Sequence, residues 1–217
     1  MRGLPGHQTE TAWAESEIGE PLRDVSLVYV LDGRRTMRLV SESGRIHFFK
    51  VARALRGECE RLGWLSGRLP VPRVCAFHQA TDVDWLLTEG LPGEDLTSER
   101  HRADPHQVVE LLASALRQIH ELDASDCPFR EGEQDGVIIH GDACLPNFVV
   151  NNGRLSGVID VGLCRVGSPT VDLEAAVWSL RHNLGDGWGG RFLDAYGWHV
   201  SDPETVRGFV ASYERQR

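Results

Sequence analysis

Residues 137–160, VIIHGDACLPNFVVNNGRLSGVID, carry the most informative pattern in the chain. An apolar run ends at His140, and Asn147 opens a second apolar run that reaches Asn151-Asn152-Gly153. Asn-Gly pairs favour the two-residue turn of a β-hairpin. The strand after that turn is therefore expected to return Asp160 toward Asn147, so that the two polar side chains lie at adjacent strand ends.

Three side chains in this stretch are candidates for chemistry. Asn147 and Asp160 offer hard oxygen ligands, the type that Mg²⁺ takes while it keeps waters and binds substrate phosphates. Asp142 lies just outside that pair and can accept a proton from a hydroxyl. Taken singly, each has a structural explanation: a turn cap for Asp142, a local hydrogen bond for Asn147 and a strand end for Asp160. Taken together, their spacing favours function.

Short β-rich runs separated by turn residues precede this stretch and predict an antiparallel sheet with one helix inserted after its third strand. Residues 1–24 have no sustained periodicity and are expected to be irregular or partly helical. The expected strands cover 26–31, 36–40, 46–50, 73–78 and 84–89, and the expected helix covers about 54–66.

Leu91-Pro92-Gly93 interrupts both charge and periodicity, and we place a hinge there. Apolar spacing predicts a mainly helical second part, with helices at 105–121, 170–183, 188–197 and 203–214. The expected fold class is therefore α+β, with domains at 1–90 and 91–217.

Composition excludes several classes of protein. The chain has 217 residues, 41% of them hydrophobic, and no apolar run approaches the roughly 18 residues of a membrane span. A formal net charge of −9 repels phosphate backbones and favours cationic partners. The five cysteines are scattered, without any Cys-x-x-Cys pair. We expect a cytoplasmic protein that favours cationic partners and binds neither nucleic acid nor membrane. The oligomeric state stays open.

Lys50 is the single lysine among 23 basic residues, and it ends the third expected strand. One explanation is a coding bias toward arginine with one survivor. The other is that this position requires a compact ammonium group.

Four segments together resemble the aminoglycoside 3'-phosphotransferases, the kanamycin and neomycin kinases, from about Ile46 onward. Residues 1–45 match poorly. The resemblance implies a two-lobed protein-kinase-like fold, with a nucleotide-binding lobe at 1–90 and a catalytic, acceptor-binding lobe at 91–217. It also implies ATP as the phosphate donor and Mg²⁺ as the associated ion. The segments are HGDACLPNF (140–148), GVID (157–160), DWLLTEGLPGEDL (84–96) and HELDASDCPF (120–129).

The resemblance assigns a role to each matching position. Asp142 matches the catalytic aspartate that orients the acceptor hydroxyl and takes its proton, and Asn147 and Asp160 match the residues that hold Mg²⁺. The remaining matches concern ATP: Lys50 on the α- and β-phosphates, Glu58 as the ion-pair partner of that lysine, and the backbone of Glu89 and Leu91 on the adenine edge.

The chain also departs from that family, as a shortened member. The connector between Cys127 and His140 is short where the antibiotic kinases carry a helical insert, and residues 212–217, SYERQR, end in arginine. The loop that covers the phosphates is hard to place, since Asp32-Gly33 also fits an ordinary hairpin turn. Candidates to replace the lost acceptor-binding charge are Glu131, Glu133, Asp135 and Asp186.

Three functions fit these observations. The first is an ATP-dependent phosphotransferase acting on an aminoglycoside hydroxyl. The second is a kinase of another small-molecule alcohol, and the third is a non-catalytic ATP-binding module. Asp172 is expected to brace the active-site loop, and Cys144 is expected to be a small packed side chain rather than a nucleophile served by His140 or a zinc ligand.

Overall fold

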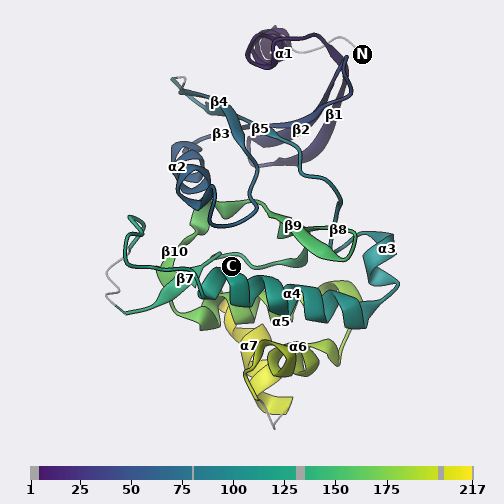
Figure 1. Cartoon of the computed structure of the whole chain (residues 1–217), viewed down its shortest axis with the longest axis vertical. Helices are drawn as coiled ribbons and strands as arrows, with labels where there is room; N and C mark the ends of the chain where they lie inside the picture. The colour runs from purple at the N-terminus through teal and green to yellow at the C-terminus, as the bar shows by residue number, and fades with distance from the viewer. Residues whose placement is uncertain (1–4, 80, 131–134, 200–202, 217) are drawn as a thin grey trace. The chain divides into compact units, whose positions relative to one another are not determined.

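The computed structural model describes residues 5–79, 81–130, 135–199 and 203–216, and the chain divides into two compact units (Figure 1). The first unit comprises Met1–Gly63 and Pro72–Gly90, and the second comprises Trp64–Val71 and Leu91–Arg217. The segment Trp64–Val71 thus groups with the second unit, ahead of the hinge expected near residue 91. The functional roles expected for domains 1–90 and 91–217 stay predictions.

The first unit is built on a five-stranded antiparallel sheet with the strand order β1-β2-β3-β5-β4. Alternate residues of the central strands, such as Met37 and Leu39 or Phe49 and Val51, are buried in one core, as the two-residue period of a strand requires. The elements of this unit are α1 (Pro5–Ile18), β1 (Leu22–Leu31), β2 (Arg34–Ser41), β3 (Ile46–Ala52), α2 (Arg56–Leu65), β4 (Val74–Gln79) and β5 (Asp84–Glu89), and the last two residues of α2 group with the second unit.

Helix α1 agrees with the partly helical alternative expected for residues 1–24 and covers Pro5–Ile18. It buries Ala14 in the core of the sheet, and the Trp13 ring lies 5.5 Å from that of Phe49 and 5.4 Å from that of Trp85 between centroids. The segment has too few apolar residues to form a periodic stripe, so its sequence alone gives little helical signal. Packing against the sheet stabilises the helix instead.

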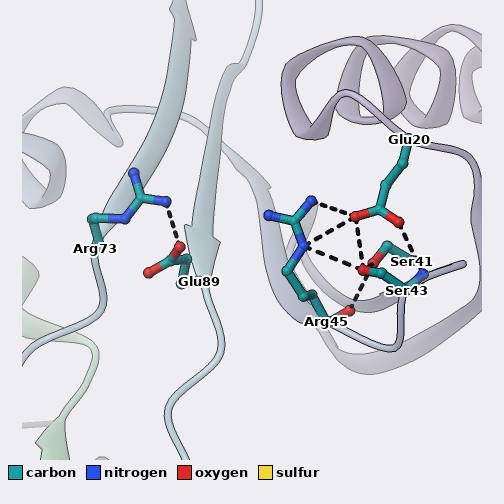
Figure 2. A network of polar contacts seen from close by, with 6 residues as sticks. All are labelled: Glu20, Ser41, Ser43, Arg45, Arg73 and Glu89. Carbon is teal, nitrogen blue, oxygen red and sulfur yellow. Dashed lines mark hydrogen bonds and ion pairs between the residues drawn. The ribbon is translucent and has the colours of Figure 1, made fainter.

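Glu20 forms hydrogen bonds beside the open end of the β1–β2 hairpin (Figure 2). Its carboxylate accepts hydrogen bonds from Ser43 N at 2.9 Å and from Arg45 Nε at 3.0 Å. The Arg45 guanidinium, together with the Ser43 N–H, lowers the pKa of Glu20 to about 2. This network is exposed to solvent, so it orders the turn after β2 without contributing much burial.

The second unit is mainly helical, with small two- and three-stranded sheets, which confirms the expected α+β class. Its helices α4, α5, α6 and α7 pack against one another, and the apolar face of α4 is buried along its length. Its elements are β6 (Glu94–Asp95), α3 (Glu99–Arg102), α4 (Pro105–His120), β7 (Val137–Ile139), β8 (Phe148–Asn151), β9 (Arg154–Val158), β10 (Arg165–Gly167), α5 (Pro169–Leu184), α6 (Trp188–Tyr196) and α7 (Pro203–Gln216).

The expected hairpin is present as β8 and β9. Asn151 pairs with Arg154 across a two-residue turn, in which Asn152 and Gly153 have φ values of 51° and 73°. Positive φ at both positions is the geometry that Asn-Gly favours in hairpins. The hairpin therefore begins just after Asn147 and ends just before residues 159–160. Among the residues that the structure describes, no helix is long and apolar enough to cross a membrane.

Candidate active site

Asp172 on α5 braces the loop that follows β7, which confirms its expected role. Its carboxylate accepts the backbone N–H of His140 at 2.6 Å and of Gly141 at 2.8 Å. Gly141 has a φ of +86°, and a Cβ at this position would lie 2.6 Å from the carbonyl oxygen of Leu163. Only glycine fits this backbone without strain. Gly141, the residue before Asp142, is therefore fixed both by its hydrogen bond to Asp172 and by its backbone conformation.

A third partner of the Asp172 carboxylate comes from the end of α4. His120 Nε2 lies 3.1 Å from Asp172 Oδ2, and His120 Nδ1 lies 2.7 Å from the hydroxyl of Tyr196. The Asp172 side chain is fully buried, and a buried carboxylate is stable only when its oxygens are hydrogen-bonded. Three helices therefore support the loop. His120 lies in one of the family-like segments, but no pattern in the sequence indicated this role.

His140 connects the loop to the end of β9. Its Nδ1 accepts the N–H of Asp142 at 3.2 Å, and its Nε2 lies 2.9 Å from the carbonyl oxygen of Ile159. These partners require the proton on Nε2. Both ring nitrogens are therefore engaged with the backbone, and the ring is not available as a base for Cys144. The buried Cys144 thiol fits the expected packed side chain.

Asn147 and Asp160, the predicted Mg²⁺ ligands, are held on either side of the β8–β9 hairpin. Asn147 Nδ2 donates to the carbonyl oxygen of Asp142 at 2.9 Å, which leaves the side-chain oxygen of Asn147 as the ligand atom. Ile159 N donates to Asn147 O at 3.0 Å and closes the hairpin beside Asp160. Asp160 itself has left-handed backbone angles, φ 57° and ψ 45°. Such a conformation is uncommon outside glycine and clusters at functional sites.

The donor set fits Mg²⁺. One carboxylate and one amide oxygen are hard ligands, and Mg²⁺ in phosphate-transfer sites takes one or two such groups and fills the rest with water and phosphate. The fold places the two residues at the open end of one hairpin, Asn147 before β8 and Asp160 after β9. Their roles toward a metal stay predictions.

The carboxylate of Asp142 has two donors that no sequence pattern predicted. The hydroxyl of Tyr213, on α7, donates to Asp142 Oδ1 at 2.9 Å. The thiol of Cys144 lies 3.2 Å from the same oxygen. Burial of the phenol raises the pKa of Tyr213, and the neighbouring Cys144 raises it further. No local pattern in residues 212–217 indicated this contact.

Lys50 and Glu58 meet in the first unit. Nζ of Lys50, on β3, lies 2.6 Å from Oε1 of Glu58, in the first turn of α2. The short interval between them in the sequence is therefore sufficient for an ion pair. The Glu58 carboxylate is buried, so its charge depends on partners such as this ammonium. Their role toward ATP stays a prediction.

The predicted adenine contacts, Glu89 and Leu91, lie on either side of the division between the units. The N–H of Glu89 is already donated to the carbonyl of Arg73 at 2.9 Å, so only its carbonyl is a candidate for adenine. The side chains of Glu89 and Arg73 form an ion pair (Figure 2), and the Arg73 guanidinium lowers the pKa of Glu89. Leu91 packs closely over Gly157 of β9.

The candidates for acceptor charge are not gathered into a site among the residues that the structure describes. Asp186 is highly exposed after α5 and pairs with Arg181, Oδ1 to Nε 3.0 Å. Asp135 is exposed as well. Glu131 and Glu133 lie outside the described residues. In the part of the chain that the structure describes, these carboxylates therefore form no cluster, and their role toward an acceptor stays a prediction.

The Asp32-Gly33 pair forms an ordinary two-residue hairpin turn. Leu31 pairs with Arg34 across it, and both central residues have positive φ, 47° and 79°. The turn thus has the same local geometry as the one between β8 and β9. This geometry is explained by hairpin formation alone, without any contact to phosphates.

Comparison with known proteins places the chain in a family. The sequence pattern of the phosphotransferase enzyme family (APH) matches residues 20–134 and 130–209. That match begins earlier than Ile46, so the expectation that residues 1–45 fit poorly was too narrow. Among curated proteins, the aminoglycoside 3'-phosphotransferase of Niallia circulans is 31% identical over 212 residues, covering 75% of this chain and 81% of that protein. That of Streptomyces ribosidificus is 30% identical over 202 residues, covering 70% and 77%.

Solved structures agree with this result. The crystal structure of an aminoglycoside 3'-phosphotransferase of type VIII superposes with a TM-score of 0.75 at 26% identity, covering 94% of this chain and 97% of that one. The phosphotransferase APH(3'')-Id of Streptomyces rimosus, solved with ADP and streptomycin, shares the fold with a TM-score of 0.71 at 22% identity, covering 96% and 97%. The expected protein-kinase-like fold is confirmed. The chain therefore belongs to the phosphotransferase enzyme family (APH), with aminoglycoside 3'-phosphotransferases among its relatives.

Proposed function

We propose that the protein transfers the γ-phosphate of ATP to a hydroxyl group of an aminoglycoside. The observation that carries this proposal is the loop at Asp142. Its backbone is held by Asp172, and its carboxylate is oriented by separate donors. Such pre-organisation suits phosphoryl transfer, in which a protein acts mainly by positioning groups and neutralising charge. Relatives named aminoglycoside 3'-phosphotransferases support the acceptor class.

In this proposal Asp142 is the general base. It takes the proton of the acceptor hydroxyl while that oxygen bonds to the γ-phosphorus and the bond from phosphorus to the β–γ bridging oxygen breaks, which releases ADP. Asn147 and Asp160 would hold Mg²⁺, which neutralises charge on the phosphate oxygens. Lys50, oriented by Glu58, would bind the α- and β-phosphates, and the backbone of Glu89 and Leu91 would bind adenine.

The first unit would accordingly bind the nucleotide, and the second would supply the base and the acceptor site. Asp186 remains a proposed acceptor contact, although its carboxylate is paired with Arg181. The five cysteines, all free thiols in the structure, support a reducing, cytoplasmic setting.

The test is product formation with a panel of aminoglycosides. Purified protein is incubated with Mg·ATP and kanamycin, neomycin or streptomycin, and the phosphorylated sugar is followed by mass spectrometry. Asp142→Asn is expected to lower turnover by roughly 10²–10⁴-fold, the usual scale for loss of a general base. Asp194→Asn, the same change at an exposed carboxylate on α6, is the matched control and is expected to be fully active.

The outcomes separate the remaining functions. ATP binding without a phosphorylated aminoglycoside, but with product from another alcohol, would retain the chemistry and replace the acceptor. ATP binding without product from any alcohol would indicate a non-catalytic module. A fully active Asp142→Asn protein would remove Asp142 from the mechanism.

The experiment on Lys50 must take its ion-pair partner Glu58 into account. Lys50→Ala removes an ammonium from the buried Glu58 carboxylate, and loss of one partner of a buried pair destabilises the fold. The double variant Lys50→Met, Glu58→Gln removes both charges. We expect that this variant retains its melting temperature better than Lys50→Ala but binds ATP more weakly than the wild type, as isothermal titration would show.

A further inference from the structure

The last described helix reaches the proposed catalytic carboxylate. Tyr213, on α7, donates its hydroxyl to Asp142 Oδ1 at 2.9 Å. The Cys144 thiol lies 3.2 Å from that oxygen and 3.3 Å from the Tyr213 hydroxyl. Both donor side chains are buried, whereas Asp142 is partly exposed. The three groups thus form one polar cluster on the interior side of the Asp142 carboxylate.

Packing against α5 holds Tyr213 at this place. The Tyr213 ring lies 5.1 Å from the ring of Trp178 between centroids, and Trp178 is in turn stacked on His182 at 5.0 Å. Helix α5 also supplies Asp172 and the Ser179 hydroxyl, whose Oγ accepts a hydrogen bond from Leu145 N at 2.9 Å. The same helix therefore positions both the backbone and the side-chain partner of the Asp142 loop.

The two oxygens of the Asp142 carboxylate differ in their hydrogen-bond partners. A carboxylate accepts hydrogen bonds but donates none, so the phenol O–H must be the donor to Oδ1. Within the described part of the chain, both donors to the Asp142 carboxylate reach Oδ1, and Oδ2 receives none. Hydrogen bonds to a charged group are stronger than neutral ones, so they restrict rotation of the carboxylate and leave Oδ2 to the acceptor.

We propose that Tyr213 is a positioning residue for phosphoryl transfer, which acts with Cys144 by holding Asp142 Oδ1 so that Oδ2 faces the acceptor hydroxyl. The proposal rests on the function proposed above for Asp142. It assigns helix α7 a part in catalysis, although residues 212–217, SYERQR, end in arginine.

The hydroxyl and the ring of Tyr213 have separable effects. If Tyr213 only packs against Trp178, Tyr213→Phe is nearly silent because it retains the ring. If the hydroxyl positions Asp142, Tyr213→Phe lowers kcat by about 10- to 100-fold, the scale expected when a reacting group is misplaced. The KM values for ATP and acceptor are expected to change less than about threefold, because no contact with either substrate is removed.

The experiment compares four proteins by steady-state kinetics and thermal unfolding. They are the wild type, Tyr213→Phe, Cys144→Ala, and Tyr29→Phe as the control. Tyr29 is an exposed tyrosine on β1, so its variant loses a hydroxyl far from this cluster in the sequence and is expected to retain the kcat of the wild type. Cys144→Ala is expected to lower kcat less than Tyr213→Phe, because a thiol is a weaker donor.

Crystal structures of the wild type and Tyr213→Phe add a readout that needs no acceptor. We expect the Asp142 carboxylate to rotate or to become disordered in the variant. An unchanged carboxylate, or a wild-type kcat in Tyr213→Phe, would overturn the proposal. A wild type that phosphorylates nothing would overturn the function proposed for Asp142 instead, and the crystal structures would still decide whether Tyr213 positions the carboxylate.

Discussion

Two hairpins in this protein share a turn and differ in their surroundings. The β1–β2 and β8–β9 hairpins both close with two residues of positive φ, Asp32-Gly33 and Asn152-Gly153. Most apolar side chains of β1 are exposed, Leu27 by 60%, and β1 is an edge strand of its sheet. Phe148 of β8 is fully buried. The same local signal therefore produces a hairpin in both places, whether the first strand is exposed, as β1 is, or buried, as β8 is.

The open ends of the two hairpins are closed in the same way. The β8–β9 end is closed by a backbone hydrogen bond from Ile159 N to Asn147 O at 3.0 Å, and the β1–β2 end by one from Glu42 N to Pro21 O at 3.0 Å. Beside the β1–β2 end, the Glu20 carboxylate adds hydrogen bonds from Ser43 and Arg45 (Figure 2). A solvated ion pair adds little stability to such a backbone bond. The two hairpins therefore differ in the burial of their strands rather than in how their open ends are closed.

Truncating one apolar residue in each hairpin should give the largest difference in the free energy of unfolding. Phe148→Ala is expected to reduce the free energy of unfolding by about 3–5 kcal/mol, since it leaves a cavity in a packed core. Leu27→Ala is expected to change it by less than about 0.5 kcal/mol, as exposed positions do. Urea unfolding of both variants measures this, and equal losses would contradict the contrast.

Gly157 of β9 lies in close contact with Leu91, and its substitution is expected to have the next largest effect on stability. A Cβ on Gly157 would lie 1.9 Å from Cδ1 of Leu91, so Gly157→Ala forces that side chain to move. We expect a loss of about 1–3 kcal/mol, as in other overpacked sites, and a higher KM for ATP if Leu91 binds adenine. Unchanged stability and unchanged KM would show that Leu91 moves without cost and that its position is unimportant.

Replacing the turn glycine by alanine should lower the free energy of unfolding equally in the two hairpins. Gly33 and Gly153 both have positive φ, and a Cβ added at either glycine would meet no atom within 4 Å beyond its chain neighbours. Gly→Ala therefore costs only the left-handed backbone conformation, which is about 1 kcal/mol in each case. Chemical unfolding of the two variants checks this, and a much larger loss at Gly153 would mean that burial of the hairpin adds to the cost of its turn.

The smallest effect is expected from Glu20. Its pKa is lowered from 4.5 to about 2 in the folded protein, so its ionised form stabilises the fold above pH 4.5, and that contribution is lost as the pH falls through about 2. Glu20→Gln should therefore lower stability slightly at neutral pH and not at all below pH 2. The pH dependence of unfolding, in low and high salt, tests this. A difference that persists at the acid end would point to lost hydrogen bonds rather than charge.

The elements of the fold were predictable where a local signal was sufficient. Alternating apolar residues predicted the strands, and Asp104 before Pro105 is an N-cap and first-turn pair of the kind that starts helices. For helix α1 the sequence predicted only an irregular or partly helical segment, because its few apolar residues, Trp13 and Ala14 among them, become part of a core only against the sheet. Local signals depend on neighbours in the sequence, and this helix depends on neighbours in space.

The sequence by itself determined the β8–β9 hairpin, and with it the places of Asn147 and Asp160, because turn chemistry and strand period act over a few residues. Tertiary structure alone decided the partners of the Asp142 loop. Tyr213 is 71 residues from Asp142 in the chain, and His120 meets Asp172 across 52 residues. Helix packing brings such side chains together, and no short pattern records which residue of one helix will face a given residue of another.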